Sequence, residues 1–133
     1  MSETRIALAL LKGLEAWQIA NVAAFTASGI AQSAPVGAPY RDESGQEYQP
    51  MFVEPALVFA ARPSRMRRTL ARALERDLAV AVYTRGMFTT FNDADNRAVV
   101  ADAKTEDLDL VGLAMYGPAH LVEETVKGLS LHR

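Results

Sequence analysis

Short uninterrupted apolar runs alternate along the chain with longer stretches in which apolar residues recur at helical spacing. Runs of this kind are typical of strands buried on both faces of a sheet. They lie at residues 6–11, 56–60, 79–83 and 110–115. The helical stretches between and after them lie at residues 14–28, 65–76, 95–101 and 118–127. The first helical stretch is apolar almost all round, so we expect it to be covered on most sides.

Residues with capping preferences stand at the ends of these helical stretches. Gly29 is placed to end the first helix, and Gly128 to end the last. Ser64 is placed to cap the start of the second helix, and Asn92 or Asp93 the start of the third. These signals predict the helix boundaries.

A loop rich in Pro and Gly follows the first helix and leads to two short polar segments, 40–42 and 46–48, around Glu43-Ser44-Gly45. This pattern predicts a short hairpin. The alternation of strands and helices predicts an α/β fold with a mixed, largely parallel sheet and helices packed on its faces. No repeat or linker interrupts the 133 residues, and we expect one domain over residues 1–133.

The composition excludes several kinds of chemistry. The chain has no cysteine, and His120 and His132 lack further metal ligands at suitable spacing, so we expect no metal site. No P-loop or dinucleotide-binding glycine pattern occurs, and we expect no cofactor. No apolar run is long enough to span a membrane. A formal net charge of −2 argues against general attraction to nucleic acid or membrane. We therefore expect a cytoplasmic protein that binds neither DNA nor membrane.

Basic charge is nevertheless concentrated in one place. Six of the eleven arginines lie between residues 62 and 76. Arg65, Arg68, Arg72 and Arg76 share one face of the second helix and are candidate phosphate contacts. The alternative, which is commoner for such stripes, is a solvated helix face. We expect at most weak, sequence-indifferent RNA binding.

Three stretches carry a resemblance to a known family: Asn-Val-Ala-Ala at 21–24, Asp-Glu-Ser-Gly at 42–45, and Gly-Leu-Ala-Met-Tyr-Gly-Pro at 112–118 leading to Lys-Gly-Leu at 127–129. From Ile6 to Leu131 the chain resembles the bacterial domain-of-unknown-function family numbered two thousand. That family is similar in fold to the type II peptidyl-tRNA hydrolases. The resemblance implies a peptidyl-tRNA hydrolase type II-like fold and names no activity, because the family is uncharacterised.

The resemblance also indicates where this chain departs from the hydrolases. They carry a lysine before a Val-Ala-Ala step in the first helix, then a Gln and a nearby His. The matching positions here hold Asn21, Phe25 and Ser28. An amide neither titrates nor supplies positive charge to an oxyanion, so the role of the lysine is lost. Asn21 remains open to two interpretations, a ligand-orienting amide in a cleft or a buried amide bonded to backbone groups.

A second hydrolase feature maps loosely onto the segment after the third apolar run. In the hydrolases an acidic residue in this segment is followed by threonines. The matching residues in this chain are Thr84, Arg85, Thr89 and Thr90. The carboxylate is replaced, while the threonines remain as candidate ligand contacts. This departure again weakens the case for hydrolase chemistry.

Two further residues are candidates on position alone. Lys12 follows the first apolar run, at the end where α/β sheets commonly bind ligands, although a solvated lysine is the simpler interpretation. Trp17 could stack on a ring, although a lone tryptophan on an apolar helix more often packs in a core or interface.

The sequence thus leads to two functional hypotheses. The favoured one is a non-catalytic small-ligand-binding or interaction module, and the alternative is a hydrolase of peptidyl or aminoacyl conjugates with a rewired active site. The hydrolase hypothesis depends on similarity of fold, which is weak support for function. We also expect a homodimer, because one small sheet layer cannot cover so apolar a first helix.

Overall fold

A five-stranded sheet forms the centre of the protein in a computed structural model that describes residues 3–133. The strand order is β5-β6-β1-β4-β7. The bounds are β1 Thr4–Leu11, β4 Ala56–Ala61, β5 Ala79–Thr84, β6 Leu110–Pro118 and β7 Ser130–Leu131. The four predicted strands are confirmed within a few residues. β7, which is two residues long, was not predicted because it contains no apolar run.

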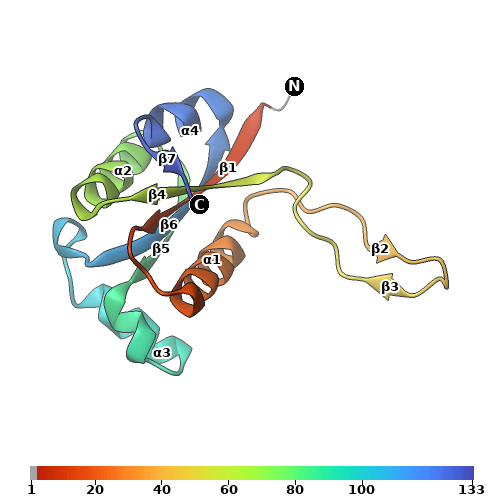
Figure 1. Ribbon diagram of the computed structural model, residues 1–133, viewed down its shortest axis with the longest axis horizontal. Coiled ribbons are helices and arrows are strands. Elements are labelled where there is room, and N and C mark those ends of the chain that lie inside the picture. Colours follow the sequence, from red (N-terminus) through yellow and green to blue (C-terminus); the bar gives the residue numbers. More distant parts are fainter. Residues whose placement is uncertain (1–2) are drawn as a thin grey trace.

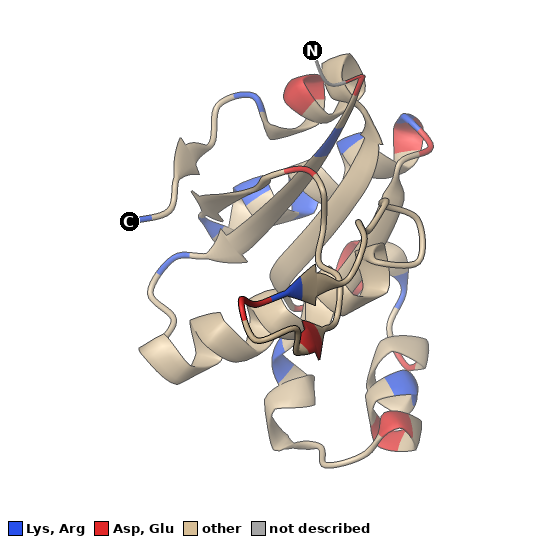
Figure 2. Cartoon of the chain, turned by 90° about the vertical axis from the view of Figure 1, so that its right-hand side faces the viewer, with Lys and Arg blue, Asp and Glu red and all other residues tan. Residues whose placement is uncertain are grey.

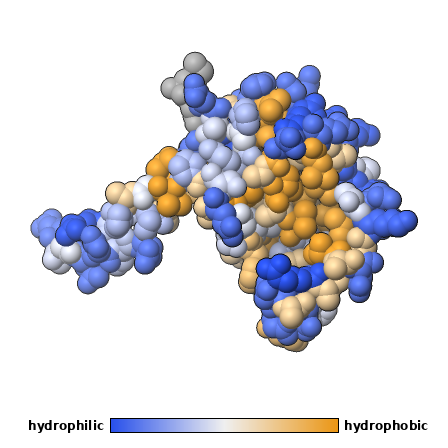
Figure 3. All heavy atoms as spheres, turned by 180° about the vertical axis from the view of Figure 1, so that it is seen from behind, coloured by the Kyte–Doolittle hydropathy of each residue, from blue (hydrophilic) through white to orange (hydrophobic). Residues whose placement is uncertain are grey.

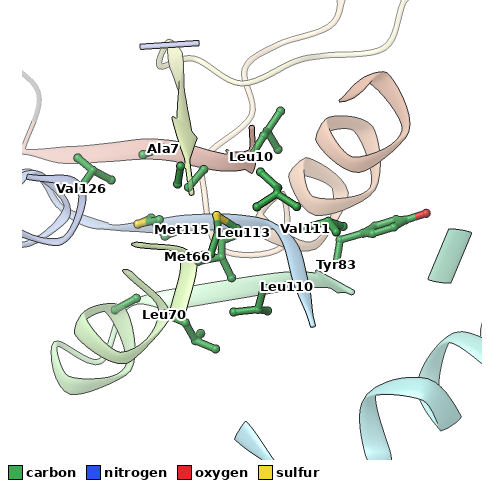
Figure 4. Packing of buried hydrophobic residues seen from close by; sticks show 14 of the residues in the cluster. Ala7, Leu10, Met66, Leu70, Tyr83, Leu110, Val111, Leu113, Met115 and Val126 are labelled. Atoms are coloured by element: carbon green, nitrogen blue, oxygen red, sulfur yellow. The ribbon is translucent and has the colours of Figure 1, made fainter. Parts of the chain in front are cut away.

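Helices cover both faces of this sheet, as predicted (Figure 1). The bounds are α1 Ala16–Ile30, α2 Pro63–Glu75, α3 Asp93–Ala101 and α4 Ala119–Val126. Ile6 and Leu8 of β1 join Ile30 of α1 in one apolar cluster. The alternate residues of β1 join a larger cluster with Met66 of α2 and Val122 of α4. Figure 4 shows part of this larger cluster, in which side chains of β6 and α2 point toward one another.

The prediction of a largely parallel sheet is wrong. Of the four strand pairings, only β1 with β4 is parallel. β6 lies between β1 and β5 and is antiparallel to both. The connection from β5 to β6 contains α3, but α3 buries none of its residues and does not cross the sheet face. A helix that stays off the sheet allows the next strand to return antiparallel, and the hydrophobic pattern does not distinguish the two cases.

Two predicted helix boundaries are also wrong. Gly29 does not end α1, which continues to Ile30 and closes at Ala31. A Cβ at Gly29 would lie 2.8 Å from the Cβ of Ala81, so the glycine serves close packing of α1 on β5. Ser64 does not cap α2, because the helix begins one residue earlier at Pro63. A proline in the first turn is equally suited to a helix start.

The caps of the other two helices agree better with the sequence. Asn92 caps α3, and its side chain accepts a hydrogen bond of 2.8 Å from the backbone N–H of Asp95. Gly128 follows α4 with a φ of 93°, which a glycine adopts without strain. The last helix begins at Ala119, one residue later than the predicted range, because Pro118 ends β6.

The predicted hairpin is confirmed as β2 Tyr40–Arg41 paired with β3 Glu47–Tyr48, and it stands away from the sheet as an arm (Figure 1). The carboxylate of Asp42 organises its turn. It accepts hydrogen bonds from the backbone N–H of Ser44 at 2.9 Å and from the hydroxyl of Tyr48 at 2.8 Å. The Tyr48 bond is the main reason that the pKa of Asp42 is lowered.

Two short 3-10 helices complete the chain, η1 at Arg85–Thr89 and η2 at Thr105–Asp107. Within residues 3–133 no helix is long and apolar enough to cross a membrane. The same residues contain no cluster of three or more side chains suited to hold a metal ion.

Candidate functional site

A groove of about 710 Å³ lies between α1 and the segment that follows β5. α1 forms one wall, the end of β5 forms the floor, and η1 with the start of α3 forms the other wall. The lining residues are Trp17, Asn21, Phe25, Val82, Tyr83, Met87, Phe88, Thr90, Phe91, Asn92, Asp93 and Asn96.

Packing of α1 on the sheet explains how three of these residues reach the groove. The buried face of α1 consists of Val22, Thr26 and Ile30. Val22 fits where Gly112 of β6 has no side chain, since a Cβ there would lie 2.1 Å from Val22 Cγ1. This close approach fixes the rotation of α1. Residues 17, 21 and 25, spaced four apart on an adjoining face, are thereby turned into the groove.

The groove is lined by a connected set of aromatic rings. The Trp17 and Phe88 ring centroids lie 5.5 Å apart with an edge-to-face angle of 69°. Phe88 lies 5.1 Å from Tyr83, which in turn lies 6.2 Å from Phe25. Trp17 and Phe25 are each 55% exposed, and Phe91 is 94% exposed. Large apolar surface left open in this way around a hollow is typical of a binding site.

Amides and hydroxyls supply most of the polar groups of the groove. The hydroxyl of Tyr83 donates a 3.4 Å hydrogen bond to Asn21 Oδ1. The hydroxyl of Thr90 faces two acceptors, Asn96 Oδ1 and the carbonyl of Met87 at 2.9 Å, and shares its one proton between them. Burial raises the pKa of Tyr83, so its phenol is neutral near pH 7. The groove can therefore exchange hydrogen bonds without offering an ionised tyrosine.

One carboxylate, that of Asp93, lies among the lining residues. It accepts a 2.6 Å bond from Nε of Arg97 and is exposed. This contact raises the pKa of Arg97. The lining contains no histidine, lysine or cysteine, so Asp93 is its one side chain that could act as a general base.

The predicted ligand residues divide between this groove and other places. Asn21 and Thr90 lie in the groove. Thr84 is buried at the end of β5. Arg85 is exposed and pairs with Asp109 at 3.2 Å, and Thr89 donates a 3.1 Å bond to the carbonyl of Gly86.

Lys12 lies at a separate hollow, at the carboxyl ends of β1 and β4. It shares a space of about 240 Å³ with Arg62 and Arg65, and a neighbouring space of about 480 Å³ with His132 and Arg133. Figure 2 shows basic segments beside this C-terminal end of the chain. The structure does not bring Lys12 together with Asn21 in one lining.

The arginine stripe lies along the seam between α2 and α4. Arg72 donates a 3.4 Å bond to the carbonyl of Lys127, and Nε of Arg76 lies 3.1 Å from a carboxylate oxygen of Glu124. The guanidinium of Arg65 lies against Gly128, where a Cβ would come within 2.7 Å of it. Arg68 is exposed. Three of the four arginines thus contact the segment that ends α4, where positive charge is favourable next to helix carbonyls.

Several groove residues were missed by sequence reasoning: Tyr83, Phe88, Phe91, Asn92 and Asn96. The available signal was the density of aromatic residues between 83 and 91 in a chain with only 8% aromatic residues. The spacing of Trp17, Asn21 and Phe25 by fours was a second signal. The sequence favours Trp17 as a core or interface residue over a stacking one. In the structure Trp17 is half-exposed and lies in the groove wall.

Comparisons with known proteins identify a similar structure and a family. A solved structure titled as a protein of unknown function, Atu0240 from Agrobacterium tumefaciens strain C58, is similar to this chain with a TM-score of 0.94 and 37% sequence identity. The similarity covers 100% of both chains. A search of curated proteins found no match. The family model described as "Protein of unknown function (DUF2000)" matches residues 4–133, and the chain belongs to that family.

Proposed function

We propose that this protein is a non-catalytic binding module that takes a small planar ligand into the groove between α1 and α3. The observation that carries the proposal is the set of aromatic rings, contributed by α1, β5 and η1, that remain partly exposed around one hollow. Exposure of Trp17 and Phe25 leaves apolar area that a ligand ring would cover, at about 25 cal/mol per Å².

The polar groups define the chemistry of the ligand further. Amide side chains such as Asn21 and Asn96 both donate and accept hydrogen bonds, so they match a ring that carries carbonyl and amino or imino groups. The Asp93 carboxylate is already engaged by Arg97. We therefore infer an uncharged heteroaromatic compound that stacks on an aromatic ring and bonds to the asparagine amides.

The alternative is a hydrolase of peptidyl or aminoacyl conjugates, based on the likeness to type II peptidyl-tRNA hydrolases. Less supports it. Asn21 stands where the resemblance places a lysine, and the groove lining offers no base beyond Asp93. Loss of both the cationic group and a free base removes the two contributions that such a reaction needs most.

Native mass spectrometry of the protein purified under mild conditions is the direct test. We expect a copurified small aromatic metabolite, which is lost in Trp17→Ala and in Phe91→Ala. Titration of the stripped protein with that compound should quench the fluorescence of Trp17, the single tryptophan. Tyr40→Ala is the matched control, since Tyr40 is a half-exposed aromatic on the hairpin and does not line the groove.

Two results would contradict the proposal. One is a ligand whose retention depends on Lys12 and is unchanged in the two groove variants. The other is turnover of a peptidyl-tRNA substrate at the rate of an authentic type II enzyme, with loss of that turnover in Asn21→Ala. The second result would establish the hydrolase alternative.

A further inference from the structure

β5 is an edge strand, and its residues from Ala79 to Tyr83 are all apolar or aromatic. It pairs with β6 on one side, and no other strand within residues 3–133 pairs with its outer side. Residues Ala79 to Val82 are half-buried, and no charged residue or proline occurs from Leu78 to Thr84. Edge strands are normally protected by charges, prolines or bulges, because their free backbone groups recruit another strand. The single irregularity of β5 comes at its end, between Tyr83 and Thr84.

The surface around this edge is apolar as well. The sheet runs from β7 at the front of Figure 1 to β5 at the rear, and Figure 3 shows hydrophobic atoms gathered over that rear side. Leu74 of the neighbouring α2 is 48% exposed. The opposite edge, β7, is only two residues long and offers no comparable template.

We propose that two copies of this chain pair through β5, antiparallel and about a two-fold axis at Ala81, so that their sheets become one. The inference goes beyond the proposed function and needs no ligand. Centring on Ala81 places Val80 opposite the partner's Val82, and Ala79 opposite the partner's Tyr83. Branched side chains face each other, and each large ring meets a small residue, which are favourable cross-strand pairs.

Charge complementarity selects this register. Asp77, two residues before β5, and Arg85, the first residue after it, each lie four residues from Ala81. In the proposed pairing the side chain of Asp77 of each copy comes near that of the partner's Arg85, so two ion pairs form for one interface. A shift of the register by two residues separates both pairs. Arg85 is free to join because its contact with Asp109 is exposed, with side chains 52% and 66% accessible, and uses only part of a guanidinium that has five donors.

The position of α1 leaves room for the partner. α1 packs over both β5 and β6, since Gly29 lies against Ala81 of β5 and Val22 against Gly112 of β6. A two-fold axis perpendicular to the joined sheet places both copies of α1 on the same face, about two strand spacings apart, or about 10 Å. Packed helices lie about 8–10 Å apart, so the two copies of α1 can lie side by side without collision. Phe25, which is 55% exposed and contacts Tyr83, lies on the side of α1 toward β5.

Solution mass is the first measurement. Light scattering at tens of micromolar protein should give twice the 14.5 kDa mass of the chain. Arg85→Glu places two carboxylates opposite each other and should raise the dimer dissociation constant by about tenfold or more, while Arg85→Lys should leave it within a few fold. Adding Asp77→Asn to Arg85→Glu should recover part of the loss, and asparagine suits the positive φ of 57° at that position. Arg97→Glu, away from β5, is the charge-matched control.

The register has its own test, because the chain contains no cysteine. A mixture of Val80→Cys and Val82→Cys proteins should form an intermolecular disulfide under mild oxidation, since the paired Cα atoms lie within the range that a disulfide spans. Either protein alone should cross-link much less, because its two cysteines are then diagonal neighbours about 7–8 Å apart. Circular dichroism of each variant checks that it is folded.

Each contrary result overturns the proposal. A monomer at these concentrations rules out the interface. A dimer whose mass is unchanged by Arg85→Glu, and whose mixed cysteine variants do not cross-link, places the contact elsewhere. If Phe25→Ala dissociates that dimer, the contact surface is the exposed side of α1 instead of β5.

Discussion

Replacement of Gly112 by alanine tests how the groove is held together. The added Cβ would lie 2.1 Å from Val22 Cγ1 and 3.3 Å from Leu10 Cδ2. Carbon atoms in contact normally lie about 3.5–4.0 Å apart, so Val22 must retreat by well over 1 Å. A valine in a helix has essentially one χ1 rotamer and cannot swing aside, so the strain moves α1 itself.

The expected cost follows from studies of overpacked cores. Extra methyl groups in a tight core typically destabilise by about 1–3 kcal/mol, and this contact belongs at the upper end because both residues are fully or nearly fully buried. For a chain of this length, about 3 kcal/mol corresponds to a fall in Tm of roughly 10 °C. Thermal unfolding followed by circular dichroism measures it.

A second substitution identifies the cause. Val22→Ala alone removes buried methyl groups and should cost about 2 kcal/mol. In the Gly112→Ala/Val22→Ala protein the new Cβ occupies space that Val22 has vacated, so the double variant should be at least about 1 kcal/mol more stable than additivity predicts. The reasoning fails if Gly112→Ala unfolds within about 0.5 kcal/mol of the parent, or if the two effects simply add.

Three further expectations concern the groove and the arginine stripe. Burial raises the pKa of Tyr83, so the folded state holds the phenol proton more tightly than the unfolded chain. The resulting stability is intact below about pH 10 and is lost as the pH rises further. In thermal melts at alkaline pH, Tyr83→Phe should therefore lose less stability than the parent protein. Asn92→Ala removes the α3 cap and should cost about 1 kcal/mol locally, seen as faster hydrogen exchange in α3 with little change elsewhere. Labelled tRNA should bind weakly at low salt and be released near physiological salt, with a log–log slope no steeper than about −3, and Arg68→Ala/Arg72→Ala should remove it; tight, salt-resistant binding would contradict this view of the stripe.

The strands were predictable from sequence because each of the four main ones is a continuous apolar run, which few other structures require. Their directions were not. Whether β6 returns parallel or antiparallel depends on whether α3 packs across the sheet, and the sequence of α3 has an ordinary cap and length either way. Gly29 shows the same limit, because a glycine that ends a helix and one that lets a helix approach Ala81 look identical without the neighbour.

The candidate site was predictable only in part. Asn21 came from the resemblance, which marks a position in α1 without saying what lies across from it. Tyr83 and Phe91 come from a segment that the hydrophobic pattern describes as a strand end and a loop. Their convergence on Trp17 depends on the rotation of α1, which is fixed by the contact of Val22 with Gly112 on the far side of the same helix. No local signal contains that information.

α1 therefore connects the groove with the edge at which pairing is proposed. One face follows β6 through Val22 and Ile30, and the adjoining face carries Trp17, Asn21 and Phe25 into the groove. Phe25 also lies at the side toward β5, where the proposed second copy would approach. If both proposals hold, pairing through β5 orders the Phe25 wall of each groove, and ligand affinity should fall on dilution below the dimer dissociation constant. A ligand affinity that is the same for monomer and dimer would show that the groove works as an independent unit.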